Sequence, residues 1–197
     1  MTPTETMTAP LSQRLKSMTG ETHDRLDRRI MAAEPFADIA NYRRFLAVQY
    51  AFHRDLDALY ADPVLASLLP DLSARNRLER IGADLADLDA PVPAADGTAP
   101  FAPGAIELPP ALGWLYVAEG SNLGAAFLYK AAAALGLDGD RGARHLAGHP
   151  DGRARHWRAF TGALDGLSLS GAEDARVIDG ARAAFTRVHA LVERHFA

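Results

Sequence analysis

The chain contains one strongly apolar segment, LGWLYVAEGSNLGAAFL at residues 112–128, which predicts a helix carrying Gly113, Gly120 and Gly124. Each glycine inside a helix costs up to about 1 kcal/mol relative to alanine. Spacings of seven and four residues put all three glycines on one side of the helix, as a strip of bare backbone. Such a strip indicates either a second helix packed very close or a planar ligand lying against the backbone.

Composition narrows the class of protein. With 197 residues, 48% of them hydrophobic, the chain suits one domain over residues 11–197, preceded by a disordered polar tail at residues 1–10. A net charge of −4 without a basic block argues against nucleic-acid binding. The absence of cysteine excludes disulfides and thiolate metal sites. Because the tail lacks the apolar core of a signal peptide, we expect a cytoplasmic protein.

The long apolar stretch at residues 112–137 does not predict a membrane span. Glu119 and Lys130 lie inside it, and a charge near the bilayer centre costs at least about 2.5–3.5 kcal/mol. We therefore expect a buried helix and no membrane association.

Hydrophobic periodicity predicts helices along most of the chain. Asp38 is the expected N-cap of the second helix, and Asp62-Pro63 is expected to end it. Residues 90–110 are rich in proline and predict a loop, and the glycine-rich residues 136–148 predict a connection with at most a short helix. No segment alternates with period two, so the fold class is all-α. The expected helices span residues 11–32, 39–60, 73–88, 111–135, 153–164 and 171–195.

Most polar residues of the chain predict no chemistry by themselves. No H-E-x-x-H, P-loop, G-x-S-x-G or G-x-G-x-x-G motif is present. Glu119 stands alone as the acid of the glycine helix, and His145 and His149 are interpreted as parts of a solvated turn. Surface positions are expected for the histidines of the last two helices, His156, His189 and His195.

His23 differs from these histidines because it shares a helical face with apolar residues. The positions Leu15, His23 and Leu26 follow helical offsets, which predicts that the imidazole points into the same core. Asp27, one turn on, could fix the tautomer of a metal-ligating imidazole, and Lys16 lies two turns back on the same side. The alternatives are a core histidine without a ligand and a solvated lysine.

Two segments together resemble the bacterial heme oxygenases. One is the glycine helix, with GWLY at residues 113–116 and EGSNLGAA at residues 119–126, and the other is THDxLD at residues 22–27. The resemblance covers nearly the whole chain in helix order and length. It implies an all-α, single-domain helical bundle that holds heme b between a proximal helix and a glycine-kinked distal helix.

The resemblance also implies roles for individual residues. His23 corresponds to the proximal iron ligand, with Asp27 as the acid beside it. Lys16 and Tyr116 fall where the family places partners of a heme propionate. The distal-helix glycines of the family correspond to Gly120 and Gly124.

Two positions depart from the family pattern. Asp27 is one methylene shorter than the glutamate commonly found there, so its bond to the histidine could run through water. Many mammalian-type members have an aspartate, which organises water, directly after the first distal glycine, and this chain has Ser121. The expected water network would then depend on the backbone around Gly120, Ser121 and Asn122 or on side chains that the sequence does not identify.

The resemblance implies a reaction in which heme is both substrate and cofactor. With O2 and electrons from an external donor, such as ferredoxin or a flavin reductase, heme is cleaved at a meso carbon to biliverdin, CO and Fe²⁺. The pairing of Lys16 with Tyr116 resembles members that cleave at the α position. A monomer is expected, with a bilin-binding photoreceptor as a possible downstream partner.

Two alternatives to this function stay open at the level of sequence. One is a heme carrier or sensor without turnover, which could use the same histidine and glycines. The other is a thiaminase-like or quinone-cofactor-forming enzyme on the same helical architecture, since fold alone does not determine function. The second alternative would need a catalytic cysteine or another polar cluster, and the chain contains no cysteine.

Overall fold

The computed structural model describes residues 9–97 and 99–197, and this part of the chain is helical without a strand. The expected tail at residues 1–10 falls almost entirely outside the described residues. The all-α prediction is confirmed. The elements are α2 (Leu11–Ala32), α3 (Ile39–Tyr60), α4 (Pro63–Leu68), η1 (Ser73–Arg75), α5 (Leu78–Asp87), α6 (Leu108–Ala134), η2 (Arg144–Leu146), α7 (Arg153–Asp165) and α8 (Gly171–His195).

Local capping signals explain where several helices begin. Asp38 is confirmed as the N-cap of α3, since its Oδ1 accepts a hydrogen bond from the Asn41 backbone N–H at 2.8 Å. A capping box of Ser170 and Glu173 starts α8. The start of α2 is capped by a residue of α7, because the Ser12 backbone N–H donates a hydrogen bond to Asp165 Oδ1 at 2.7 Å. The end of α7 therefore holds the start of α2.

Three expected boundaries differ from the structure, and the first is the start of α6 at Leu108, inside the loop expected over residues 90–110. Asp62-Pro63 does follow the end of α3, but it also starts the short helix α4, because the Asp62 carboxylate accepts from the Leu65 N–H. The single helix expected over residues 73–88 is wrong: η1 and α5 are separate elements. The side chains of Arg75 and Arg77, at this break, are buried in the protein.

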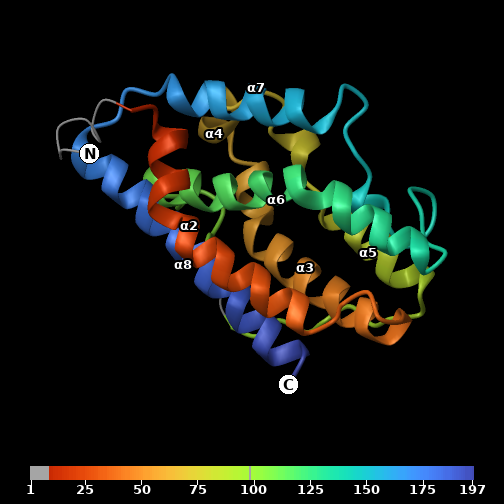
Figure 1. Cartoon of the computed structure of the whole chain (residues 1–197). Coiled ribbons are helices and arrows are strands. Elements are labelled where there is room, and N and C mark those ends of the chain that lie inside the picture. The colour runs from red at the N-terminus through yellow and green to blue at the C-terminus, as the bar shows by residue number, and fades with distance from the viewer. Residues whose placement is uncertain (1–8, 98) are drawn as a thin grey trace.

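The helices are arranged around α6 (Figure 1). The α2 and α8 helices run side by side in the same direction, tied at their starts by Arg14–Asp174 and near their ends by Arg29–Glu193. The α8 helix packs extensively on α6, whereas α2 packs mainly on α8 and less on α7. None of the helices in the described part of the chain has the length and hydropathy of a membrane span.

The α6 helix passes through two hydrophobic cores. Its first half, from Ala111 to Ala118, belongs to a core shared with α2, α3, α7 and α8. Ala125 and Ala132 in its second half belong to another core, shared with α3, α5 and η2. Between these cores, residues 120–124 are exposed or half-buried. An uncovered stretch of helix thus follows a fully buried one, and beyond it only the Ala125 and Ala132 side chains of α6 are buried.

Candidate functional site

The three glycines of α6 have different surroundings. A Cβ atom on Gly113 would lie 2.1 Å from the Val177 carbonyl oxygen and 2.5 Å from the Ala181 nitrogen. On the facing helix, a Cβ atom on Gly180 would lie 2.4 Å from the Pro110 carbonyl oxygen. Gly113 therefore serves the close crossing of α6 and α8. Of the two explanations for the glycine strip, helix packing holds at this position.

The other two glycines belong to the uncovered stretch. A Cβ atom on Gly124 would have no neighbour within 4 Å, and one on Gly120 would lie 3.5 Å from the Trp157 ring. Leu123 and Phe127, on the same part of α6, are 44% and 63% exposed. Bare backbone next to exposed apolar side chains can accept a flat apolar ligand.

His23 does not point into the core, so that prediction is wrong. Its side chain is 63% exposed, although Thr19 and Leu26 on the same helical face are buried. Phe185 of α8 lies beside it and meets the imidazole edge-on, with ring centroids 6.1 Å apart. A contact from another helix thus separates this histidine from the core. The imidazole is displayed at the surface of α2, where a ligand can reach it.

The carboxylate nearest to the imidazole is not the expected one. His23 Nδ1 lies 3.3 Å from Asp24 Oδ1, while Asp27 is exposed and makes no bond to the histidine in the described residues. Contact through Nδ1 leaves the Nε2 nitrogen for a metal. The chemistry of an iron ligand is therefore present, with Asp24 in the place expected for Asp27.

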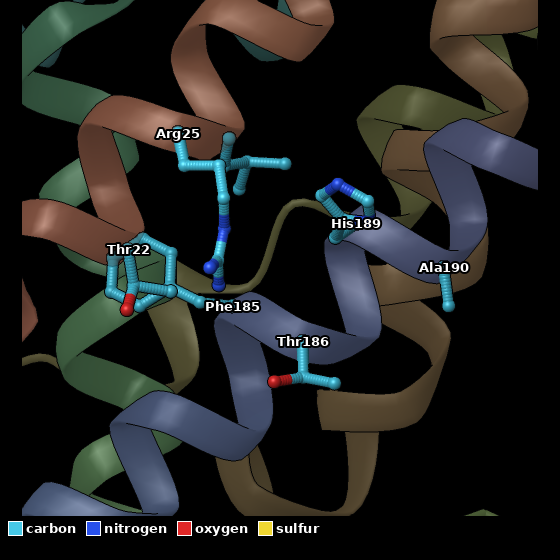
Figure 2. Close-up of a pocket in the computed structure, with 7 residues that line it drawn as sticks. Thr22, Arg25, Phe185, Thr186, His189 and Ala190 are labelled. Atoms are coloured by element: carbon cyan, nitrogen blue, oxygen red, sulfur yellow. The ribbon is translucent and has the colours of Figure 1, made fainter.

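A small groove lies between α2 and α8 (Figure 2). Its volume is about 220 Å³, and its lining includes Thr22, Arg25, Phe185 and His189. Ligand pockets for larger molecules commonly measure about 300–1,000 Å³. The groove is too small to enclose a porphyrin. Phe185, which lines the groove, also packs against His23.

Asp165, at the end of α7, interacts both with Tyr116 and with the first turn of α2. Burial and the nearby Asp165 carboxylate raise the pKa of Tyr116. The same carboxylate binds the Ser12 hydroxyl at 2.8 Å, and Lys16 lies exposed one turn further along α2. Asp165 is therefore near Tyr116 and in contact with the first turn of α2, and no direct bond between Tyr116 and Lys16 is present in the described residues.

Glu119 does not stand alone, so that interpretation is also wrong. Its side chain is 2% exposed and pairs with Arg75, which is fully buried, at 2.9 Å. The Tyr60 hydroxyl donates a hydrogen bond to the other carboxylate oxygen at 3.3 Å. Burial and the Glu119 charge raise the pKa of Tyr60, which stays protonated as a donor.

A second buried polar cluster is formed by residues of α3, α5 and η2 and contacts α6. His145 is 1% exposed, which corrects its interpretation as part of a solvated turn, and its Nδ1 lies 2.7 Å from Asp84 Oδ2. His53 is equally buried. The Nδ1 atom of His53 and the Nε2 atom of His145 have no hydrogen-bond partner in the described residues. Arg77 completes the cluster and donates to the Ala118 carbonyl at 3.0 Å.

Burial determines the charge of this cluster. Burial and, next, the Arg77 charge lower the pKa of His53 well below its usual value. Burial also lowers the pKa of His145, against the opposing effect of Asp84. Both imidazoles are therefore neutral near pH 7. Buried polar atoms without a protein partner commonly bind water, so the cluster can hold ordered water near the Ala118 carbonyl of α6.

The two polar residues of the uncovered stretch bond to nearby groups. The Ser121 hydroxyl donates to the Ala118 carbonyl at 2.7 Å. Asn122 accepts two hydrogen bonds from Arg153 Nη1, at its carbonyl (3.0 Å) and its side-chain oxygen (3.2 Å). Ser121 is exposed and Asn122 half-buried, so both remain at the open face of the helix.

Comparisons with known proteins show the family to which the chain belongs. The family model described as heme oxygenase matches residues 9–194. The chain belongs to the heme oxygenase family. Heme oxygenase PigA of Pseudomonas aeruginosa is 49% identical over 186 residues, which cover 94% of this chain and 93% of that protein. The crystal structures of the NO- and CO-bound heme oxygenase from Neisseria meningitidis match with a TM-score of 0.89 and 42% identity, over 95% of this chain and 92% of that one.

Heme is therefore the substrate, and the residues present fit it. A flat apolar molecule matches the uncovered part of α6 around Gly124, and an exposed imidazole at His23 matches its iron. The buried cluster of His53, Arg77 and His145 was not predicted. Sequence offered only a weak signal for it, namely a core-facing histidine in the periodic pattern of residues 39–60.

Proposed function

We propose that this heme oxygenase holds heme between His23 on α2 and the uncovered backbone at residues 120–124 of α6. The observation that carries the proposal is the change along α6, where the continuously buried run of residues 111–119 ends and residues 120–124 are exposed or half-buried. The chain leaves this stretch without side chains at Gly120 and Gly124. When bound, heme supplies the iron at which O2 is activated with electrons from a donor.

The proximal side fixes the ligating histidine. Contact of Nδ1 with Asp24 and edge-on packing against Phe185 restrict rotation of the His23 ring. A neutral imidazole with a carboxylate at its other nitrogen is a common arrangement for a metal-ligating histidine. Asp27 lies one turn further along the helix and can approach only through water or a side-chain rotation.

We propose that the distal side of the site lacks large side chains, which leaves room for heme, and that it orients water. Gly120, Ser121, Asn122 and Gly124 expose backbone rather than large side chains toward the proposed heme. We assign the ordering of distal water to the buried cluster of His53, Arg77 and His145, described above. This cluster replaces the aspartate that many family members place after the first distal glycine.

The regiochemistry follows from how the propionates are held. We propose that Lys16 donates a charge-assisted hydrogen bond to one propionate and that Tyr116 donates a neutral one. Burial keeps the Tyr116 hydroxyl protonated. Because this pairing resembles that of family members that cleave at the α position, we expect biliverdin IXα as the product.

The remaining parts of the proposal concern the cellular setting. O2 and an external donor, such as ferredoxin or a flavin reductase, would complete the reaction. Such donors are available in the cytoplasm, which we propose as the location. We propose that the protein acts as a monomer in which residues 11–197 form one heme-binding domain, with a bilin-binding photoreceptor as one possible recipient of the product.

The experiment that tests the site is reconstitution of the purified protein with hemin. Hemin titration followed by a reductant system should replace the Soret band with a biliverdin spectrum. In His23→Ala we expect loss of turnover and a ferric spectrum unlike that of a histidine-ligated heme, because no other group is assigned to the iron. His149→Ala removes another exposed imidazole and serves as the matched control. Unchanged turnover in His23→Ala would refute the assignment.

A further inference from the structure

A buried ion pair holds α6 immediately before the uncovered stretch. Glu119 Oε2 accepts a hydrogen bond from Arg75 Nη1 at 2.9 Å, and Oε1 accepts from the Tyr60 hydroxyl at 3.3 Å. The exposed side-chain fractions of Arg75 and Glu119 are 0% and 2%. Since both carboxylate oxygens are engaged away from solvent, the side chain is fixed in one orientation.

Arg75 connects this carboxylate to α7. Its Nε donates to the Pro70 carbonyl at 2.9 Å. Its Nη2 donates to the His156 carbonyl at 3.3 Å, and Nη1 lies 3.3 Å from His156 Nδ1. The guanidinium also lies over the Phe160 ring, 5.6 Å from its centroid. One side chain thus joins η1, α6 and α7.

The α7 helix in turn places an aromatic ring beside the first open glycine. Trp157 directly follows His156, and its ring lies 3.5 Å from the position of a Cβ atom on Gly120. The same ring packs against Tyr116, with centroids 5.4 Å apart. Because Arg75 holds His156, it also limits where Trp157 can lie against α6.

Two further arginines bind the backbone on either side of Gly120. Arg77 donates to the Ala118 carbonyl at 3.0 Å, and Arg153 donates to the Asn122 carbonyl at 3.0 Å. Carbonyls inside an α-helix already have partners four residues on. These additional bonds are therefore not needed to complete the helix, and they restrain its position from outside.

The ion pair is not explained by stability alone. The desolvation cost of a buried ion pair offsets much of its attraction, and replacing such a pair with apolar residues is often neutral. A charge-assisted hydrogen bond does, however, fix direction and distance. We propose that Arg75 and Glu119 are positioning residues, which set the rotation and height of α6 at residues 118–122 and so place the Gly120 backbone relative to heme. This inference rests on the role of Gly120 proposed above.

The first test uses the apo-protein and amide hydrogen exchange. Glu119→Gln keeps the shape of the side chain and removes its charge. We expect exchange at residues 118–124 to become about 10-fold faster or more relative to α8, because a hydrogen bond to a charged group is lost. Unchanged exchange at these residues would overturn the proposal.

A matched control is available in another interhelix ion pair. Asp55 is buried and binds Arg187 Nε at 2.7 Å, joining α3 to α8 away from the glycines. Asp55→Asn should lower overall stability and leave exchange at residues 118–124 unchanged relative to the rest of the protein. Equal acceleration at these residues in both variants would also overturn the proposal, since it would show a general loss of stability.

The second test separates positioning from packing. The double variant Arg75→Met/Glu119→Met replaces the pair with apolar side chains and should keep near-native thermal stability. We expect exchange at residues 118–124 to stay fast, kcat to fall about 10-fold or more with little change in KM for hemin, and the biliverdin isomers to become mixed. Recovery of native exchange, kcat and isomer composition would overturn the proposal. If the double variant does not fold, kcat and the isomer composition of Glu119→Gln are compared with those of Asp55→Asn, and equal changes in the two variants would overturn the proposal.

The readouts also distinguish failure of this inference from failure of the heme site. Fast exchange with native kcat and a native isomer composition would refute any effect of the pair on the reaction. The assignment of His23 is measured separately by the Soret band and would be unaffected by that result.

Discussion

The crossing of α6 and α8 gives the sharpest prediction, because the same substitution in the same helix should have opposite effects at two glycines. Gly113→Ala would place a Cβ atom 2.1 Å from the Val177 carbonyl oxygen, where ordinary contact begins at 3.4 Å. Gly124→Ala would place its Cβ atom in open space. Both changes improve intrinsic helix propensity by about 0.5–1 kcal/mol.

The magnitude at Gly113 follows from what must move. The atoms in the way belong to the backbone of α8, so the two helices would have to separate by roughly 1 Å in a closely packed core. Overpacking of cores typically costs about 1–3 kcal/mol, occasionally more, and a rigid backbone favours the upper end. We expect Gly113→Ala to lower the free energy of unfolding by about 3 kcal/mol, which corresponds to a fall in Tm of about 6–12 °C for a protein of this size.

The assay is thermal and urea unfolding of the apo-protein, followed by circular dichroism at helical wavelengths. Gly124→Ala should unfold at the native temperature or slightly above, and should act only on the heme complex. A Gly113→Ala protein of native stability with impaired heme binding would refute the reasoning. That result would show that Gly113 faces the ligand rather than α8.

Three further predictions concern product and pH. The double variant Lys16→Met/Tyr116→Phe should produce a mixture of biliverdin isomers in place of a single α isomer, as measured by chromatography. A single β or δ isomer from the native protein, or an unchanged isomer ratio in the variant, would contradict the proposed anchoring of the propionates. Hydrogen bonds from Arg187, together with the charges of Arg187 and Arg194, lower the pKa of Asp96. The Asp96 carboxylate therefore stabilises the fold fully above about pH 4, and this stabilisation decreases as the pH falls further. Asp96→Asn should therefore lower Tm at pH 7, with a difference from native that narrows below about pH 4; a constant difference would contradict this. Burial lowers the pKa of His53, so the unfolded chain binds a proton as the pH falls through about 6.5 and stability drops. His53→Gln should reduce the loss of Tm between pH 7 and pH 5, and an undiminished loss would place the effect elsewhere.

Local signals explain which parts of the fold could be predicted. The α3 helix has an N-cap at Asp38 and a regular apolar face, and α8 begins at a capping box, so their boundaries agree with the prediction. The glycine helix was visible from composition alone. The fold family and the expected roles of His23 and Gly124 came from the resemblance of two short segments to heme oxygenases.

Contacts between distant residues explain what could not be predicted. Arg75 and Glu119 lie 44 positions apart in the chain, and nothing near either residue indicates a buried partner. His145 is surrounded in sequence by glycines and arginines typical of a surface turn, yet Asp84, 61 positions away, binds it inside the protein. His23 shows the opposite error, since periodicity identified its face but not the Phe185 ring that separates it from the core.

The glycine strip shows why sequence left two explanations open, since both hold along one helix. Gly113 and Gly124 lie on the same side of α6, but α8 crosses only its first half. The crossing at Gly113 and the bond from Arg75 at Glu119 anchor the helix before the uncovered stretch, and after it Ala125 and Ala132 pack into the second core. An uncovered stretch between two anchors can expose backbone to a ligand without fraying, because the packed residues on both sides supply the stability that the glycines cost. A free helix end with the same glycines would lack this support, which is a physical reason for placing the site in the middle of a 27-residue helix.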